Sequence, residues 1–108
     1  MTRLLVCTLA LAFAGDVQAG GNAAAGKTKA AQVCAACHGA DGNKPITPEN
    51  PILAGQHQDY LLRAMKDYKS GKRNNPIMKG FAAGLSNQDM EDLAAWFASQ
   101  SSNLHFQR

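Results

Sequence analysis

Large apolar side chains are scarce in this sequence of 108 residues. Aromatic residues make up only 6% of it, and positions 20–108 hold nineteen large apolar residues beside fifteen alanines. A domain of this size buries only about 60% of its unfolded surface, and small domains usually need a staple or a bound group. The scarcity argues against a core built from side chains alone. Something else should help to fill the interior.

Strong charge and long apolar runs are also absent. The formal net charge is +3, too small an excess for a dedicated nucleic-acid binder. The main apolar run, Leu4 to Ala14, is too short to span a bilayer, so no stable membrane insertion is expected. A short basic start precedes this run, and Val17 and Ala19 occupy the small positions of a cleavage site after it. We therefore predict a signal peptide over residues 1–19, export to the periplasm, and one domain over residues 20–108.

Cysteine is rare as well, with three residues in the whole chain. Cys7 lies within the predicted signal peptide, which leaves Cys34 and Cys37. An exported protein can form disulfides, but two cysteines three positions apart close a tiny loop and remove little entropy from the unfolded chain. This pair is therefore a poor structural disulfide.

The rest of the pattern predicts an all-α fold with three main helices. The first is expected from Ala23 to about Cys37, in an alanine-rich segment with Asn22 as its N-cap. The second spans Gln58 to Ser70 and ends before Gly71, which suits the C′ position. The third opens at Ser86, with acidic residues near its positive end.

Glycines and prolines separate these helices. They predict irregular loops over residues 38–56 and 72–85. The tail over residues 101–108 is polar and is expected to be loose. No period-two alternation, internal repeat or low-complexity linker interrupts this pattern, so a single helical domain is expected.

The motif with chemical character closes the first predicted helix, as Cys34-Ala35-Ala36-Cys37-His38. On a helix, positions three and four apart share a face, about 5–6 Å from one another. Two thiols at that spacing can add to the two vinyl groups of a haem, and the following imidazole can then ligate the iron. The spacing thus predicts one covalently bound haem c with His38 as the proximal ligand. A planar apolar cofactor would also supply the missing core.

Two other interpretations of this motif stay open from the residues alone. A thioredoxin-like dithiol would follow a strand, and the pattern predicts none. A zinc site would need further ligands, which only His38, His57 and His105 could supply. The haem interpretation is favoured over both.

A haem iron has a second axial face, whose ligand decides between electron transfer and ligand binding. The candidates are Met65, Met78, Met90, His57 and His105. Met65 and Met90 lie on apolar stripes of predicted helices, where methionine is usually core filler, and the two histidines suit a solvated surface. Met78 lies instead in the second predicted loop, so it suits a segment draped over the distal face of the haem.

Further segments match a known family: Gly26, residues 34–39, 51–56, 60–61, 69–73, 78–82, 85–89 and 92–97. On these residues the sequence resembles the small class I c-type cytochromes of bacteria, in particular the single-haem unit of the cytochrome c4/c553 group. The resemblance covers nearly all of residues 20–108. Cytochromes c4 themselves carry two such units in tandem, whereas this chain has one C-x-x-C-H motif. Any intramolecular electron partner is therefore expected on another chain.

The resemblance implies roles for residues outside the motif. Met78 would be the distal iron ligand. The carbonyl of Pro51 would accept a hydrogen bond from Nδ1 of the ligand histidine and so fix its imidazole. The first and last helices would cross closely, with Gly26 against Leu93 and Trp96.

The function expected from this resemblance is periplasmic electron transfer in a respiratory chain, without enzymatic activity. An iron held by His38 and Met78 can change oxidation state with little ligand rearrangement, and a thioether favours Fe(II). One alternative is a haem c subunit of a larger oxidoreductase, such as a flavocytochrome c sulfide dehydrogenase. A gas-binding haem protein, in which Met78 does not ligate, and a zinc-binding structural module are further alternatives.

The expected partners are redox proteins, and two docking surfaces are possible. Lys72, Arg73 and Lys79 could gather basic charge near the haem edge and attract an acidic partner. Ile77 and the two alanines of the C-x-x-C-H motif could instead form an apolar docking patch. The salt dependence of the association rate would distinguish the two surfaces.

Overall fold

A computed structural model describes residues 20–102 of the chain. The predicted signal peptide, His105 and most of the predicted loose tail lie outside the described residues. The helices are α1 (Ala23–Val33), α2 (Ala35–His38), α3 (Gln58–Ser70), α4 (Pro76–Ala83) and α5 (Asn87–Ala98). Residues 20–102 contain no strand, so the predicted all-α class is confirmed. None of these helices is long and apolar enough to cross a membrane.

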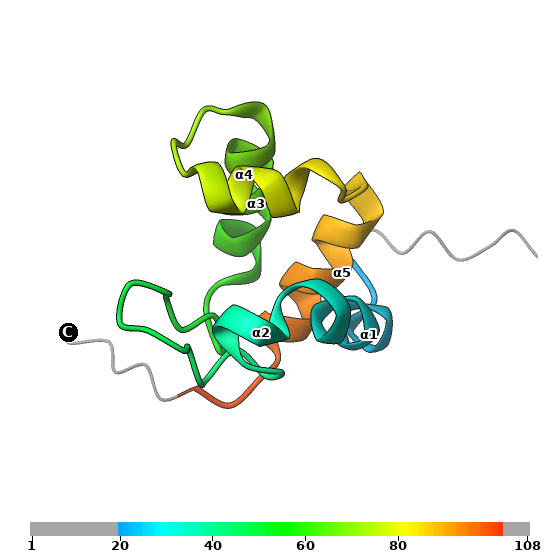
Figure 1. Cartoon of the computed structure of the whole chain (residues 1–108). Coiled ribbons are helices and arrows are strands. Elements are labelled where there is room, and N and C mark those ends of the chain that lie inside the picture. Colours follow the sequence, from blue (N-terminus) through cyan, green and yellow to red (C-terminus); the bar gives the residue numbers. More distant parts are fainter. Residues whose placement is uncertain (1–19, 103–108) are drawn as a thin grey trace, which may run out of the picture.

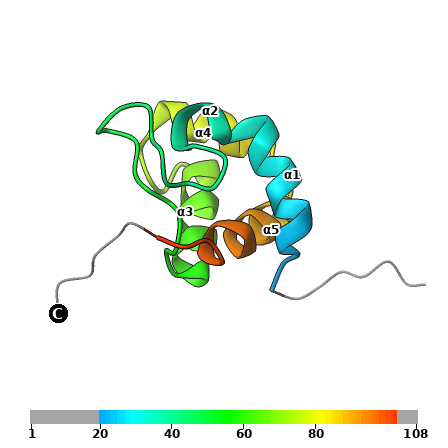
Figure 2. The same ribbon diagram turned by 90° about the horizontal axis from the view of Figure 1, so that it is seen from below.

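The two terminal helices form one side of the molecule. α1 packs across α5, and α2 continues from α1 (Figure 2). A Cβ atom placed on Gly26 would lie 2.0 Å from the carbonyl oxygen of Asp92 and 2.8 Å from Cβ of Trp96. The close crossing and the contact with Trp96 are therefore confirmed, although the nearest atom belongs to Asp92 and not to Leu93. Glycine is required here because any side chain would push the helices apart.

A buried carboxylate adds a second link between α1 and α5. The side chain of Asp92 is only 8% exposed and accepts hydrogen bonds from the Asn22 amide at 2.7 Å and the Gln88 side chain at 2.8 Å. Asn22 in turn caps α1, because its side chain accepts the amide of Ala25 at 3.1 Å. The predicted N-cap is confirmed. Because Asn22 is also bonded to Asp92 of α5, α5 fixes the position at which α1 begins.

The other side of the molecule consists of α3 and α4. α3 contacts α5, and α4 lies against α3, above α2 in the view of Figure 1. α3 has the predicted bounds and ends at Gly71, whose φ of +83° is the left-handed conformation that favours glycine. Residues of α4 and of the α1–α2 segment line one cavity.

Two predicted element boundaries are wrong. The first helix does not run on to Cys37, because α1 ends at Val33, Cys34 has a φ of −115° that departs from the regular helical value, and a short second helix follows. The loop predicted over residues 72–85 contains α4. A proline breaks a helix in its interior, but Pro76 occupies the first turn of α4, where the N–H that it lacks would have no partner within the helix. Asn75 caps that turn by accepting the amides of Ile77 and Met78, both at 3.1 Å.

The third predicted helix begins as expected. Ser86 and Asp89 form a capping box, in which each side chain accepts the other residue's amide at 3.0 Å. The Ser86 amide, as the largest cause, lowers the pKa of Asp89, so its carboxylate stays ionised beside the helix start.

The core is small, as the composition requires. Its buried members are Ala30, Leu61, Leu85, Met90, Leu93, Ala94 and Phe97. Met90 is 1% exposed, which agrees with its predicted role as core filler. Three of these residues also line a cavity, so the core is continuous with the candidate site: Leu61, Leu85 and Phe97.

Candidate haem site

The C-x-x-C-H motif forms α2 and the turn into it. Cys34 is the N-cap residue of this short helix, and Cys37 and His38 lie in its single turn. Both thiols are free and half-buried. Burial, and secondarily the charge of Cys37, raises the pKa of the Cys34 thiol to about 11. Cys34 is thus presented as a thiol, and Cys37 follows it in the single turn of α2.

The imidazole of His38 is buried, with 6% of its surface exposed, and its orientation is fixed by a hydrogen bond. Its Nδ1 lies 2.9 Å from the carbonyl oxygen of Pro51. A carbonyl can only accept, so Nδ1 carries the proton and Nε2 keeps its lone pair. This is the tautomer that a metal-ligating histidine needs. The structure therefore gives Pro51 the contact that the resemblance implied.

These side chains face a cavity of about 430 Å³, a volume typical of ligand sites. Cys34, Cys37 and His38 line it from α2, and Met78 lines it from α4. Figure 1 shows α4 above and α2 below, and both helices contribute residues to the cavity lining. Most of the remaining wall is apolar and comes from four helices, α1, α3, α4 and α5, and from the loops before α3 and after α4: Val33, Leu53, Leu61, Ala64, Met65, Ala82, Leu85 and Phe97.

The structure separates the other candidate ligands. Met65 also lines the cavity, half-buried on α3, although the sequence predicted it as core filler. Met90 lies in the core and does not line the cavity. His57 is exposed at the start of α3, also away from the cavity lining.

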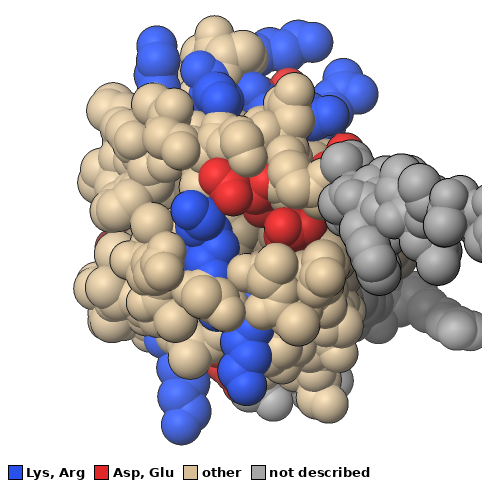
Figure 3. All heavy atoms as spheres, turned by 90° about the vertical axis from the view of Figure 1, so that its right-hand side faces the viewer, with Lys and Arg blue, Asp and Glu red and all other residues tan. Residues whose placement is uncertain are grey.

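The predicted docking cations do not lie together at this cavity. Arg73 lines it, with its guanidinium 4.8 Å from the ring centre of Tyr68 and within 3.5 Å of the Tyr60 hydroxyl. Lys72 and Lys79 do not line it, and the Lys79 ammonium lies beside Gly71 at the end of α3. On the face shown in Figure 3, Lys and Arg side chains lie at the top, middle and bottom, with acidic residues between them. That face carries no single basic patch.

The rim of the cavity on α4 is apolar instead. Ile77 and Phe81 both line the cavity and remain 70% and 46% exposed. They lie four positions apart and so share one face of α4. Ile77 and Arg73 were both expected near the haem edge, whereas Phe81 had no predicted role in the site, because only the position of α4 brings it to the cavity.

The residues present fit a covalently bound haem. The cavity has two free thiols on one turn, an imidazole whose free nitrogen can bind iron, a thioether opposite, and apolar walls for a porphyrin. The described residues include no group of three His, Cys, Asp or Glu side chains that could hold a metal ion. They also include no strand before the thiols. Within residues 20–102, the zinc and thioredoxin-like interpretations therefore find no support.

The fold and the motif together define a class I c-type cytochrome, a class that binds haem. The family model described as Cytochrome c matches residues 23–101. The chain therefore belongs to the cytochrome c family, and several of its relatives are cytochromes c4.

Three of these relatives show the extent of the similarity. The chain is 54% identical over 101 residues to cytochrome c4 of Pseudomonas aeruginosa, covering 93% of this chain and 49% of that protein. It is 43% identical to cytochrome c-554(548) of Halomonas halodenitrificans, covering 74% of this chain and 98% of that protein. The crystal structure of reduced recombinant cytochrome c4 from Pseudomonas stutzeri superposes with a TM-score of 0.71 at 44% identity, covering 78% of this chain and 48% of that one. The chain thus spans about half the length of the cytochromes c4 that it matches.

Proposed function

We propose that this protein is a carrier of single electrons, not an enzyme, with one haem c bound covalently to Cys34 and Cys37. In this proposal His38 is the proximal iron ligand and Met78 the distal one. The observation that carries it is that all four side chains line the same largely apolar cavity, Met78 from α4 and the other three from α2 and its N-cap. When bound, haem supplies a one-electron Fe(III)/Fe(II) couple.

Each residue of the chain has a defined task in this proposal. Cys34 and Cys37 each supply a thiol for a thioether bond, which holds the cofactor at the end of α1. His38 offers Nε2 as a ligand while Pro51 holds the opposite side of its ring. Met78 offers a soft thioether, which favours Fe(II), and the apolar walls disfavour the extra charge of Fe(III). The reduction potential is therefore expected to be high for a haem protein.

The setting of this carrier is part of the proposal. We infer export to the periplasm through cleavage of residues 1–19, and an electron path to redox proteins of a respiratory chain. The exposed Ile77 and Phe81 beside the cavity favour an apolar docking patch over the acidic-faced partner that Lys72, Arg73 and Lys79 would attract. An association rate that barely changes with ionic strength supports the apolar patch, and a steep decrease with salt contradicts it.

Covalent attachment is tested by mass spectrometry of the exported protein. The expected mass is that of residues 20–108 plus one haem, which acid–acetone extraction leaves in place. The Cys34→Ala/Cys37→Ala variant should fail to accumulate, because the small core then lacks its covalently held cofactor. Recovery of an unmodified chain from a periplasm that matures other c-type cytochromes would overturn the proposal. Copurification with a larger chain would instead make the protein a subunit of an oxidoreductase.

Distal ligation is tested on the oxidised protein by the weak far-red band of a thioether bound to Fe(III). Met78→Ala should abolish this band and admit external ligands such as imidazole. Met65→Leu and Met90→Leu are the controls, because they change volume little and each should cost less than about 1.5 kcal/mol. Loss of the band in Met65→Leu but not in Met78→Ala would transfer the role to Met65. Rapid carbon monoxide binding by the reduced wild-type protein would favour a gas-binding protein.

A further inference from the structure

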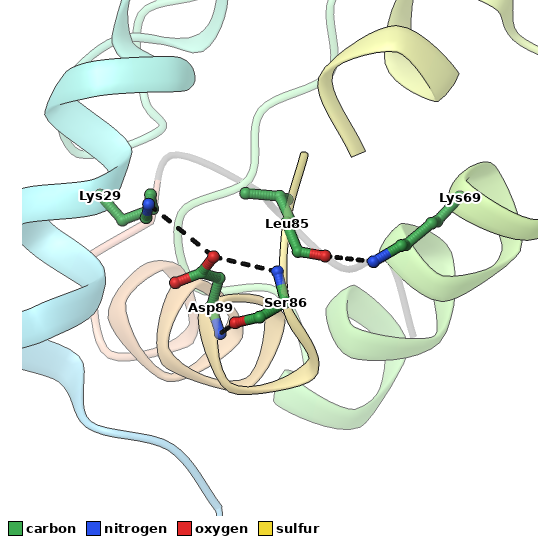
Figure 4. Close-up of polar contacts among 5 residues, drawn as sticks. All are labelled: Lys29, Lys69, Leu85, Ser86 and Asp89. Atoms are coloured by element: carbon green, nitrogen blue, oxygen red, sulfur yellow. Dashed lines mark hydrogen bonds and ion pairs between the residues drawn. The ribbon is translucent and has the colours of Figure 1, made fainter. Parts of the chain in front are cut away.

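The corner between α4 and α5 is held by one lysine from each side (Figure 4). Lys69, in the last turn of α3, donates a hydrogen bond to the backbone carbonyl of Leu85. Lys29, on α1, lies 3.7 Å from a carboxylate oxygen of Asp89 in the first turn of α5. The two contacts lie within a few residues of each other but come from opposite sides of the molecule.

The two lysines hold different parts of this corner. Lys29 contacts a helix start that is already closed, because Ser86 and Asp89 satisfy each other's amides. Lys69 contacts a carbonyl that α5 does not use. The carbonyl of the N-cap residue accepts the first helical hydrogen bond, and Leu85 lies one residue before that N-cap. The Lys69 ammonium therefore does not compete with a helical hydrogen bond for this carbonyl. A hydrogen bond from a charged donor is also stronger than one from a neutral donor.

The position of Leu85 connects Lys69 to the cavity. Leu85 lies two positions after the end of α4, and its amide donates a hydrogen bond to the Ala82 carbonyl of that helix at 3.0 Å. Its side chain is only 7% exposed and lines the same cavity as Met78. α4 packs mainly against α3, the helix that carries Lys69. The Lys69 contact thus ties the C-terminal end of the Met78 helix to α3, as Asn75 caps its N-terminal end.

From this arrangement we infer that Lys69 is a positioning residue for Met78. Its hydrogen bond to the Leu85 carbonyl favours the position of α4 in which the Met78 side chain lines the cavity. When α4 moves outward, this hydrogen bond is weakened. An external ligand must compete with that arrangement, so removal of the Lys69 ammonium should ease displacement of Met78. The inference rests on the proposed ligation by Met78.

The test is an imidazole titration of the oxidised haem-loaded protein, followed through the far-red band. Lys69→Leu should bind imidazole about tenfold more tightly than wild type, a change equal to about 1.4 kcal/mol. Lys69→Gln retains a donor but is too short to reach, so it should behave like Lys69→Leu. Lys69→Arg keeps a long charged donor and should bind imidazole within about twofold of wild type.

Lys29→Leu is the matched control. It removes a lysine from the same corner but leaves the Lys69–Leu85 contact intact, so imidazole affinity should stay at the wild-type value. Guanidinium unfolding of all four variants measures their global stability separately. Equal imidazole affinities in Lys69→Leu and Lys29→Leu, or no recovery in Lys69→Arg, would show that Lys69 does not position Met78. Absence of the far-red band in wild type would instead refute ligation by Met78, and with it the role inferred for Lys69.

Discussion

The two sides of the cavity differ in how tightly their residues are packed. On the side of α1 and α5, Gly26 lies against backbone, a buried Asp92 joins two helices, and Trp96 donates from Nε1 to the Ala40 carbonyl at 3.1 Å. On the side of α3 and α4, Ile77 is 70% exposed, and a Cβ added at Gly80 would meet nothing within 4 Å. The thiols and His38 thus belong to a tightly packed frame, whereas Met78 belongs to a short, open helix.

Because of this difference, the segments that carry the two proposed iron ligands, His38 and Met78, should differ in local stability. Segments with few buried contacts open with lower free energies than the core does. The Met78 helix should therefore detach before the α1–α5 frame unfolds, and the haem should remain bound through Cys34, Cys37 and His38 in that state. An electron carrier tolerates this difference in stability, because the covalent attachment through Cys34 and Cys37 does not depend on ligation by Met78.

The largest expected effect comes from breaking the tight side with Gly26→Ala. The new methyl group would lie 2.0 Å from a backbone carbonyl, so α1 and α5 must separate. Overpacking costs typically about 1–3 kcal/mol, and contact with backbone places this variant at about 3 kcal/mol or more. Guanidinium unfolding of the haem-loaded protein measures this loss. Ala31→Gly, at an exposed position of α1, is the control and should cost only about 1 kcal/mol. A Gly26→Ala variant as stable as wild type would mean that the helices do not cross at this position.

The features predictable from the sequence are those that depend on near neighbours in the chain. Asn22, Ser86 and Gly71 each mark a helix boundary through their own side chain or backbone freedom. The C-x-x-C-H motif likewise carries its chemistry within five residues. Pro76 alone does not predict α4, because a proline can end one helix or begin another, and only the Asn75 cap decides between the two.

The walls of the cavity could not be predicted in the same way. Leu61, Leu85 and Phe97 meet there from distant parts of the chain. The helical pattern shows that such residues are buried, but a buried face can pack on another helix or on a cofactor. Met65 illustrates this, because it does both: it packs against the core and lines the cavity.

Removal of the N-cap of α1 or of α4 should have a smaller effect on stability, and the effect should differ between the two sides of the cavity. Asn22→Ala and Asn75→Ala each remove a capping side chain, and each should cost about 1 kcal/mol. Asn22→Ala should lower the midpoint of global unfolding. Asn75→Ala should instead lower the temperature at which the far-red band disappears, with the global midpoint nearly unchanged. Asn75 also lines the cavity, so Asn75→Ser, which keeps a capping oxygen, is its control and should retain the band. Equal responses from Asn22→Ala and Asn75→Ala in both measurements would contradict a separate, weaker α4.

The smallest expected effect is a gain, from tightening the open side with Gly80→Ala. Gly80 lies inside α4, has open space around its Cα and does not line the cavity. Alanine in a helix interior is more stable than glycine by about 0.5–1 kcal/mol, because less backbone entropy is lost on folding. The gain should be confined to α4, so the far-red band should persist to higher temperature. Imidazole should bind about two- to fivefold more weakly, which corresponds to the same free energy. The identical substitution is thus destabilising at Gly26 and stabilising at Gly80. If Gly80→Ala instead strengthens imidazole binding, then α4 is packed against something at Gly80, and the two sides of the cavity are more alike than their described contacts indicate.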